Sequence, residues 1–127
     1  MPGVTYDTGA LIAGERNSRT MWALHARFLE REVVPVVPAP VLAEAWRGGA
    51  RQAGLGRLLA PCEVEAMSEE QARHVGVLAG RAGHGDVVDV TVVEGALRRG
   101  DAVVTSNADH IKAIATAAGR RLAVEVV

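Results

Sequence analysis

The sequence predicts an α/β protein in which helices cover both faces of a mainly parallel central sheet, forming a three-layer α/β/α sandwich. Short apolar runs typical of strands alternate with longer segments of helical spacing along the whole chain. Right-handed crossovers between parallel strands place the intervening helices on the faces of the sheet. The 127 residues suffice for one hydrophobic core, so we expect a single domain over residues 1–127.

The first half of the chain contains two expected strands and four expected helices. Val4, Thr5 and Tyr6 are β-branched or aromatic, as is typical of a strand. Pro38 and Pro40 suit the first turn of a helix. The expected elements are a strand at 3–6, a helix at about 8–14, a helix at about 18–32, a strand at 33–37, a helix opened by the two prolines, and a short helix within the flexible segment 48–56.

The second half continues the alternation and carries helix caps. Ser68 with Gln71 three residues later is typical of a helix start, and Gly100 and Gly119 are typical of helix ends. The valine-rich segment 86–99 could pass for a strand, but its length and caps favour a helix. The expected elements are a strand over "CEVEAM" with Cys62, Val64 and Ala66 on one side, helices at 68–81 and 86–99, a strand over "AVVT", a helix from 108 closed by Gly119, and a strand over "RLAVEV".

Charge and cysteine content exclude several classes of protein. The 15 acidic residues nearly balance the 14 lysines and arginines, which excludes a disordered tail and a bulk polycation. Local arginine patches remain compatible with nucleic-acid binding. The single Cys62 cannot form an internal disulfide, and the N-terminus lacks a signal segment, so we expect a cytoplasmic protein. No run approaches the roughly 20 apolar residues of a membrane span, so we expect no membrane partner.

Acidic residues occur where a parallel sheet would bring them together. Ligands of open parallel sheets bind beyond the carboxyl ends of the strands. Asp7 follows the first strand, and Asn107 and Asp109 follow the strand "AVVT". Glu44 lies within "PAPVLAEAWRGG", and Asp89 lies on the apolar face of its helix. We expect these side chains to meet in one crevice.

Several carboxylates in one crevice require a cation. Without one they would repel each other, and their pKa values would rise. Oxygen ligands without cysteine or an organised set of histidines select Mg²⁺ or Mn²⁺ over Zn²⁺. Because such ions keep positions for water and substrate phosphate, the set predicts phosphodiester chemistry.

Several of these acids also have a purely structural explanation. Asp7 could cap the helix that follows it. Asp86 is better explained as an N-cap than as a ligand, although it could support the site, and Asp89 in the same first turn would serve the helix dipole.

Other polar and aromatic side chains are expected to have structural roles. Asp101 follows Gly100 in a turn and is expected at the surface. Glu94 is expected to pair with Arg98 in solvent. Trp22 and Trp46 are expected in the core or at an interface. The histidines show no metal spacing and are expected to be packed or solvated; they are His25, His74, His84 and His110.

Three segments together resemble PIN-domain ribonucleases, especially the VapC-type toxins of bacterial toxin–antitoxin pairs. They are "YDTGALIA", "VLAEAW" and "DVVDVTVVEGALRRGDAVVTSNADHI", and the resemblance covers nearly the whole chain. It implies a PIN-like fold and an endoribonuclease that hydrolyses RNA phosphodiester bonds with Mg²⁺ or Mn²⁺. It also implies an antitoxin partner and a homodimer, which exposed apolar faces around Trp22, Phe28 and Trp46 would permit.

The resemblance assigns roles to individual residues. Asp7, Glu44 and Asp89 match acids of the family pattern. The fourth family acid usually follows "TS", where this sequence has Asn107, with Asp109 two residues later. The resemblance thus implies Asp7, Glu44, Asp89 and Asp109 as catalytic residues, and Asp7, Asp89, Asn107 and Asp109 as metal ligands.

Neighbouring polar residues could support this site. Thr105 or Ser106 could hydrogen-bond a carboxylate or a bound water, or cap the helix from residue 108. Arg47 and Arg51 could contact RNA phosphate near Glu44, or form a solvated face in which Glu44 pairs with one of them.

Two other functions are alternatives to a ribonuclease. Asn107 in place of an acid leaves open a catalytically weakened PIN-fold binding module. A phosphoreceiver signalling domain also holds Mg²⁺ beside acids, but Tyr6 next to Asp7 and Lys112 within a helix disfavour it.

Overall fold

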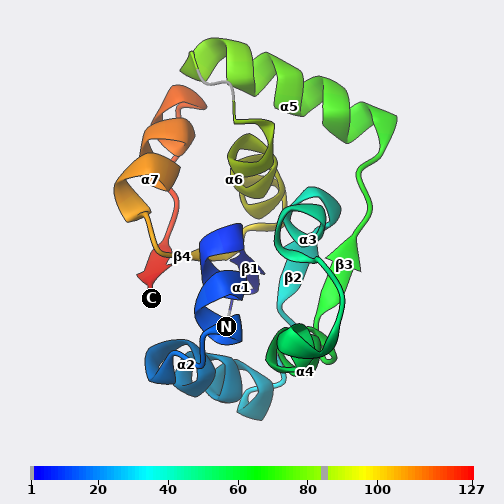
Figure 1. Cartoon of the computed structure of the whole chain (residues 1–127). Helices are drawn as coiled ribbons and strands as arrows, with labels where there is room; N and C mark the ends of the chain where they lie inside the picture. Colours follow the sequence, from blue (N-terminus) through cyan, green and yellow to red (C-terminus); the bar gives the residue numbers. More distant parts are fainter. Residues whose placement is uncertain (1, 84–85) are drawn as a thin grey trace.

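The computed structural model describes residues 2–83 and 86–127, which contain a five-stranded parallel sheet with strand order β3-β2-β1-β4-β5 (Figure 1). The strands are β1 (Val4–Tyr6), β2 (Val36–Pro38), β3 (Glu63–Glu65), β4 (Ala102–Thr105) and β5 (Val124–Val126). The helices are α1 (Thr8–Glu15), α2 (Arg19–Glu30), α3 (Ala39–Ala45), the 3-10 turn η1 (Ala50–Gln52), α4 (Ala53–Leu59), α5 (Glu69–Ala82), α6 (Val87–Arg99) and α7 (Ala108–Ala117). The predicted α/β class is confirmed.

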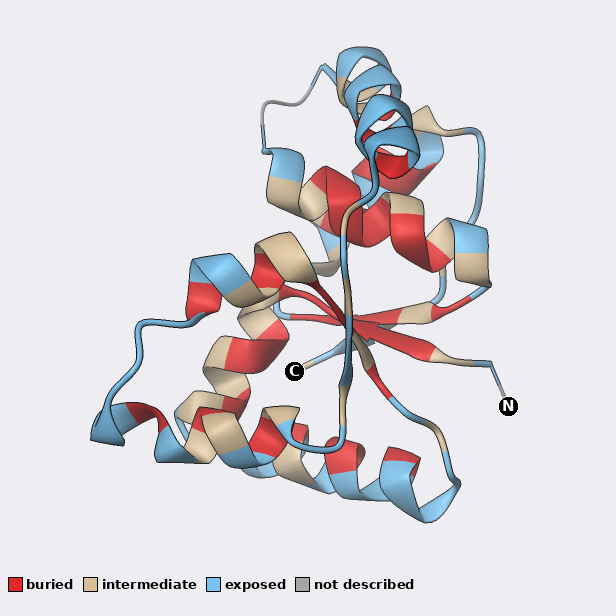
Figure 2. Ribbon diagram, turned by 90° about the vertical axis from the view of Figure 1, so that its right-hand side faces the viewer, coloured by how far each residue is buried: buried red, intermediate tan, exposed pale blue. Residues whose placement is uncertain are grey.

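Helices cover both faces of the sheet (Figure 2). α1 packs against α2, α3 and α4, while α5, α6 and α7 pack against one another. From β1 the chain moves outward to β2 and β3, then returns to the other side of β1 to form β4 and β5. Because the direction reverses and the crossovers are right-handed, the two groups of helices lie on opposite faces.

The reversal creates a switch point between β1 and β4. These strands pair in parallel, with Tyr6 beside Val104. The chain leaves β1 into α1 on one face and leaves β4 into α7 on the other. Open α/β sheets bind ligands at such a point, beyond the carboxyl ends of the strands. Asp7 is the first residue after β1, and Asn107 is the second residue after β4.

The cap residues read from the sequence are confirmed, but β2 and β5 each begin three residues later than expected, β5 at Val124. The Ser68 hydroxyl accepts from the Gln71 N–H at 3.0 Å, and Gly100 ends α6 with φ 74°. β2 begins at Val36, three residues later than predicted, because the Val33 N–H donates to the Phe28 carbonyl at 2.9 Å and still belongs to the end of α2.

The face of β3 formed by Cys62, Val64 and Ala66 is largely exposed. Val64 is 44% exposed, Ala66 is exposed, and only Cys62 is half-buried. The cause is the strand order, since β3 is an edge strand with a single neighbour.

Aromatic residues of α2 pack beneath the central strand. The Tyr6 hydroxyl lies 2.8 Å from His25 Nδ1, and both residues are buried, as expected for a packed histidine. Phe28 is also buried in this layer, so it is not part of an exposed apolar face as predicted. Trp22 is half-buried and donates from Nε1 to the Gly14 carbonyl at 2.9 Å, while Trp46 is 44% exposed.

Asp101 is buried, which corrects the expectation of a surface position. The Thr5 hydroxyl donates to Asp101 Oδ2 at 2.8 Å, and Arg99 Nε donates to the same atom at 2.9 Å. The turn after Gly100 directs the chain back under β1, and the Asp101 N–H closes it by donating to the Ala96 carbonyl at 2.8 Å. The carboxylate therefore joins the end of α6 to the central strand.

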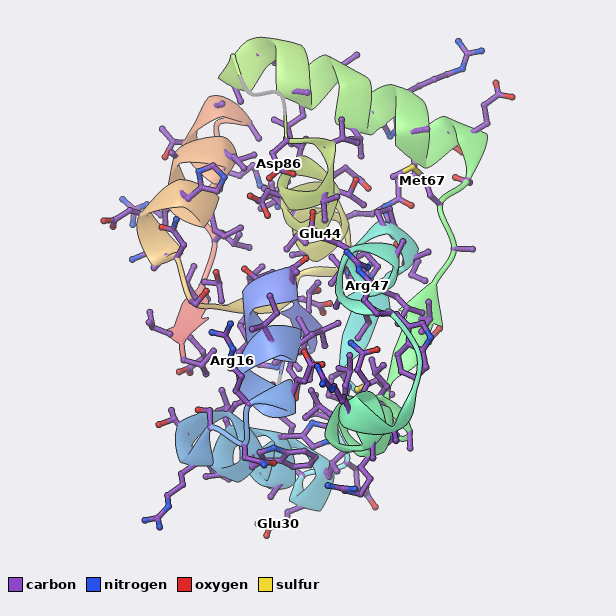
Figure 3. The ribbon with its side chains drawn as sticks, viewed as in Figure 1. Arg16, Glu30, Glu44, Arg47, Met67 and Asp86 are labelled. Carbon is purple, nitrogen blue, oxygen red and sulfur yellow. The ribbon has the colours of Figure 1, made fainter. Side chains whose placement is uncertain are left out.

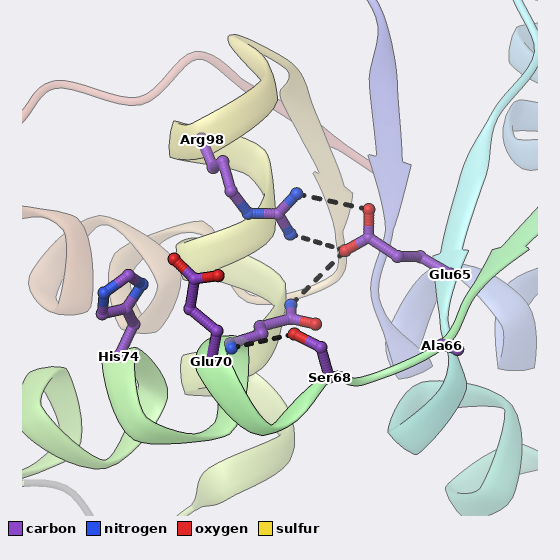
Figure 4. Close-up of a pocket in the computed structure, with 7 residues that line it drawn as sticks. Glu65, Ala66, Ser68, Glu70, His74 and Arg98 are labelled. Atoms are coloured by element: carbon purple, nitrogen blue, oxygen red, sulfur yellow. Dashed lines mark hydrogen bonds and ion pairs between the residues drawn. The ribbon is translucent and has the colours of Figure 1, made fainter.

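Glu65 extends this ion-pair network to the edge of the sheet (Figure 4). Its carboxylate lies 2.7 Å from Arg99 Nη1 and 2.6 Å from Arg98 Nη2. Burial raises the pKa of Glu65, but the two arginines outweigh it and hold this pKa below the ordinary value. The predicted pair of Glu94 with Arg98 is present at 3.2 Å, although the Glu94 side chain is largely shielded from solvent.

Within the described residues, no helix combines the length and the apolar character that a membrane crossing requires.

Asp101→Ala should lower the free energy of unfolding by about 3 kcal/mol, because the shielded Arg99 guanidinium and the Thr5 hydroxyl lose their shared acceptor. Glu69→Ala is the control, since Glu69 pairs with Arg73 where the side chains are 82% and 77% exposed, and such pairs contribute little. Denaturant titration followed by circular dichroism compares the variants. Equal, small losses would contradict the structural role of Asp101.

Candidate metal centre

Asp7 caps a helix, which was one of its two expected roles, and it is also buried. Its Oδ1 accepts from the Ala10 N–H at 2.9 Å and caps α1. The residue is only 5% exposed, and its own N–H donates to the Val104 carbonyl of β4 at 3.2 Å. Burial raises the pKa of Asp7, and the charge of Asp89 adds to the rise, while the Thr105 hydroxyl and the helix N–H groups oppose it. A helix cap is thus also a buried acid.

Two further acids stand at the start of α6. Asp86 caps the helix as predicted, because its Oδ1 accepts from the Val88 N–H at 3.1 Å and from the Asp89 N–H at 3.2 Å. Asp89 is half-buried. Its pKa is raised by burial and then by the charge of Asp86, and it is lowered by hydrogen bonding to His110.

The connection from β4 to α7 supplies polar groups around Asp7. Asn107 caps α7, with its Oδ1 accepting from the His110 N–H at 3.3 Å. The buried Thr105 hydroxyl accepts from the Asn107 N–H at 2.9 Å and also hydrogen-bonds Asp7. Thr105 therefore has the supporting contact that was one of its two expected roles. Asp109 is exposed in the first turn of α7.

His110 is the site residue that the sequence analysis missed. It was expected to be packed or solvated, but its Nε2 lies 2.7 Å from Asp89 Oδ2. One ligand atom from each of Asp86, Asp89 and His110 can be chosen so that all lie within 4.8 Å of one another. The available signal was local, since His110 follows the cap Asn107 by one helical turn and so returns to the same side of α7. His84 lies outside the described residues.

Glu44 and Arg47 lie at the end of α3. α3 contacts both α1 and α6. In Figure 3, Glu44 projects on the side of Asp86, whereas Glu30 projects from α2 at the other end of the molecule. Glu44 is exposed and has no ion pair among the described residues, so neither expected arginine partner is found there. Arg47 Nη1 donates to the Ala43 and Trp46 carbonyls at 3.2 Å and 2.8 Å.

The donor set at this edge fits a divalent cation. Burial raises the pKa values of both Asp7 and Asp89, and the charge of Asp89 raises that of Asp7 further. Among the residues that the structure covers, the buried Thr8 hydroxyl directly after Asp7 has no hydrogen-bond partner. Carboxylate, hydroxyl and imidazole groups are ligands of Mn²⁺ and similar ions. Asp86, Asp89 and His110 could therefore hold one, and Asp7 lies outside this group of three.

A different hollow lies by α5, beside the ion pairs of Glu65 (Figure 4). It has a volume of about 340 Å³, and its lining includes Ser68, Glu70, His74 and Arg98. It contains none of the acids predicted for the site. Within it, Glu65 of β3 accepts hydrogen bonds from Arg98 of α6 and Gln71 of α5 and so links these three elements.

Two solved structures share this fold. The structure of PAE2754 from Pyrobaculum aerophilum has a TM-score of 0.68 and 16% sequence identity, covering 98% of this chain and 84% of that chain. A chain of VapBC2 from Rickettsia felis, solved bound to a DNA fragment from their promoter, has a TM-score of 0.73 and 18% identity, covering 98% of both chains. The sequence matches no protein-family model and no curated protein. The structural likeness confirms the fold that the resemblance implied.

Gly9→Ala should destabilise the protein by about 1–3 kcal/mol, because a Cβ at position 9 would collide with Ser106 Oγ and lie 3.2 Å from the Ser106 backbone nitrogen. Gly56→Ala in α4 is the control: its Cβ would meet nothing within 4 Å. That change should be neutral or stabilising by up to about 1 kcal/mol. Thermal unfolding measures both. If the two variants have the same melting temperature, the close approach of α1 to the β4–α7 connection carries no stability.

Proposed function

We propose that this chain is a PIN-domain endoribonuclease that requires a divalent cation and acts as the toxin of a toxin–antitoxin pair. The observation that carries the proposal is the cluster of Asp86, Asp89 and His110 near the buried Asp7, whose pKa the charge of Asp89 raises. The likeness in fold to a chain of VapBC2 supports the class of protein. The RNA substrate would be met in the cytoplasm.

The metal would be Mg²⁺ or Mn²⁺, held by Asp7 and Asp89 with help from the caps of α6 and α7. When bound, such a cation lowers the pKa of a water and offsets negative charge on phosphate oxygens. Asp7 is preorganised for this role, because its carboxylate is fixed by the Ala10 N–H and by Thr105. Asp109, exposed on α7, and Asn107 remain candidates for outer positions.

The remaining polar residues would act on the RNA and on the attacking water. Glu44 is exposed on α3 and could accept a proton from a water at its carboxylate. Arg47 and Arg51 are exposed nearby and could neutralise the phosphate backbone. These contacts carry no information about base sequence, so they would position RNA without selecting it.

A second candidate is a binding module that keeps the fold without efficient catalysis. The observation that favours it is the role of Asn107, which replaces an acid of the family pattern and caps α7 with its side-chain oxygen. Titration calorimetry with Mn²⁺ distinguishes the two, because an enzyme should bind the ion and lose it on Asp7→Asn.

An antitoxin and a second copy of the chain are the proposed protein partners. An exposed apolar hollow of about 310 Å³ is a candidate surface for the antitoxin. It is lined by Leu42, Trp46, Gly56, Leu59, Ala60 and Val64. It joins α3 and α4 to the edge strand β3, whose outer side offers backbone groups for pairing.

The purified protein should cleave single-stranded RNA only with Mg²⁺ or Mn²⁺, and EDTA should stop it. Asp7→Asn and Asp89→Asn should each lower the rate at least about a hundredfold, because each removes a ligand charge. Glu30→Gln, exposed at the far end of the molecule, should cleave at the normal rate. Undiminished cleavage in EDTA would overturn the metal-dependent mechanism.

Asp7→Asn should leave the metal-free protein as stable as before or more stable. Asparagine still caps α1, and the folded-state pKa of Asp7 lies above its unfolded value, so the ionised carboxylate destabilises the folded state. Stability of the unmodified protein should therefore fall as pH rises from below the unfolded pKa to above the folded pKa, and Asp7→Asn should reduce that fall. Asp7→Ala loses the cap and should melt lower. Thermal unfolding between pH 3 and pH 8 tests this; a lower melting temperature for Asp7→Asn at neutral pH would contradict it.

The chain should form a dimer in size-exclusion chromatography with light scattering.

Co-expressed with the product of the neighbouring reading frame, the chain should form a complex that no longer cleaves RNA. Trp46→Ser should weaken that complex at least about tenfold, because an exposed aromatic anchor is lost. Val77→Ser on α5 is the matched control, since Val77 is also exposed but lies outside this hollow. A monomer, or a complex equally sensitive to both changes, would contradict these assignments.

A further inference from the structure

The family that this sequence resembles usually has an acid where this chain has Asn107, so position 107 adds no negative charge to the proposed site. The Asn107 side-chain oxygen accepts the His110 N–H at 3.3 Å. This amide is neutral and its oxygen already serves as the cap of α7. A cation at the switch point therefore needs another ligand from this side of the crevice.

His110 is placed to provide that ligand. It follows Asn107 by one turn of α7, and its ring is directed at α6, with Nε2 2.7 Å from Asp89 Oδ2. The His110 side chain is 30% exposed and that of Asp89 is 20% exposed, so both are partly shielded from water. No other described histidine lies within hydrogen-bonding distance of a carboxylate.

The spacing of the ligand atoms suits a single ion. Ligand atoms of Asp86, Asp89 and His110 lie within 4.8 Å of one another. Opposite ligands at bond lengths of about 2.1 Å are about 4.2 Å apart. These three side chains could thus hold one cation between them.

We propose that His110 binds the metal through Nε2, replacing the acid that position 107 lacks, and that its nitrogen makes the site prefer Mn²⁺ to Mg²⁺. The inference rests on the metal site of the proposed function and adds its selectivity. Mg²⁺ binds oxygen ligands almost exclusively, whereas imidazole becomes a better ligand along the series from Mn²⁺ to Zn²⁺. One nitrogen in place of one oxygen therefore costs Mg²⁺ binding more than Mn²⁺ binding.

Pulsed EPR of the Mn²⁺-loaded protein tests the ligand directly. At pH 8 imidazole is largely neutral and able to coordinate. The unmodified protein should show modulation from a directly bound ¹⁴N nucleus, and His110→Ala and His110→Gln should lose it. His74→Ala on the exposed face of α5 should retain it. His84→Ala is included because His84 is close to Asp86 in sequence, and it should also retain the signal.

Titration calorimetry tests the selectivity. His110→Ala should weaken Mn²⁺ binding at least about tenfold and change Mg²⁺ binding less, so that the preference for Mn²⁺ falls. Asn107→Asp should instead strengthen Mg²⁺ binding more than Mn²⁺ binding, because it restores a charged oxygen while still capping α7.

Absence of the ¹⁴N signal from the unmodified protein, or its survival in His110→Ala, would overturn the proposal. Equal losses of Mn²⁺ and Mg²⁺ affinity in His110→Ala would overturn the proposed preference for Mn²⁺. These measurements use no RNA, so they separate this inference from the nuclease. If Mn²⁺ is bound by nitrogen but the protein cleaves no RNA, the result supports His110 as a ligand and contradicts the proposed nuclease activity. If the protein cleaves RNA but no nitrogen ligand is found, the result supports the nuclease activity and contradicts His110 as a ligand.

Discussion

The arrangement of the candidate site follows from the burial of one carboxylate at the end of the central strand. β1 has neighbours on both sides and helices on both faces, so Asp7, directly after it, is withdrawn from water. A charge in such a place requires compensation. The first turn of α1 and the Thr105 hydroxyl of β4 supply part of it. Burial still raises the pKa of Asp7 despite these hydrogen bonds, and the charge of Asp89 raises it further, which is why we propose a cation near this residue.

Three helices begin near this crevice, and each has a polar cap that is also a candidate site residue. Asp7 caps α1, Asp86 caps α6 and Asn107 caps α7. Capping and ligand binding are therefore not competing explanations here. A cap must stand where a helix begins, and in a parallel sheet helices begin at the carboxyl ends of the strands, where ligands bind. The positive ends of the helix dipoles also point into this region and favour anionic groups, including phosphate.

Features governed by neighbours in sequence could be predicted, and those governed by distant contacts could not. Ser68, Asp86 and Gly100 act within one or two turns of their own helices, and their roles were evident from the sequence. The burial of Asp101 depends on Thr5, 96 residues away, and the exposure of Val64 depends on which strand lies at the edge. His110 became a site residue only through the packing of α7 against α6.

The pairing of Thr5 with Asp101 has a consequence for the order of events during synthesis. β1 leaves the ribosome first, yet one of its two neighbours in the sheet, β4, lies within the last quarter of the chain. Contacts of such large sequence separation form late, because a long loop must close first. Until β4 and α7 have been synthesised, Asp7 has no Thr105 and Asp89 has no His110. The crevice is consequently assembled only after β4 and α7 have been synthesised, and a nascent fragment that stops short of residue 102 carries Asp7, Asp86 and Asp89 without His110.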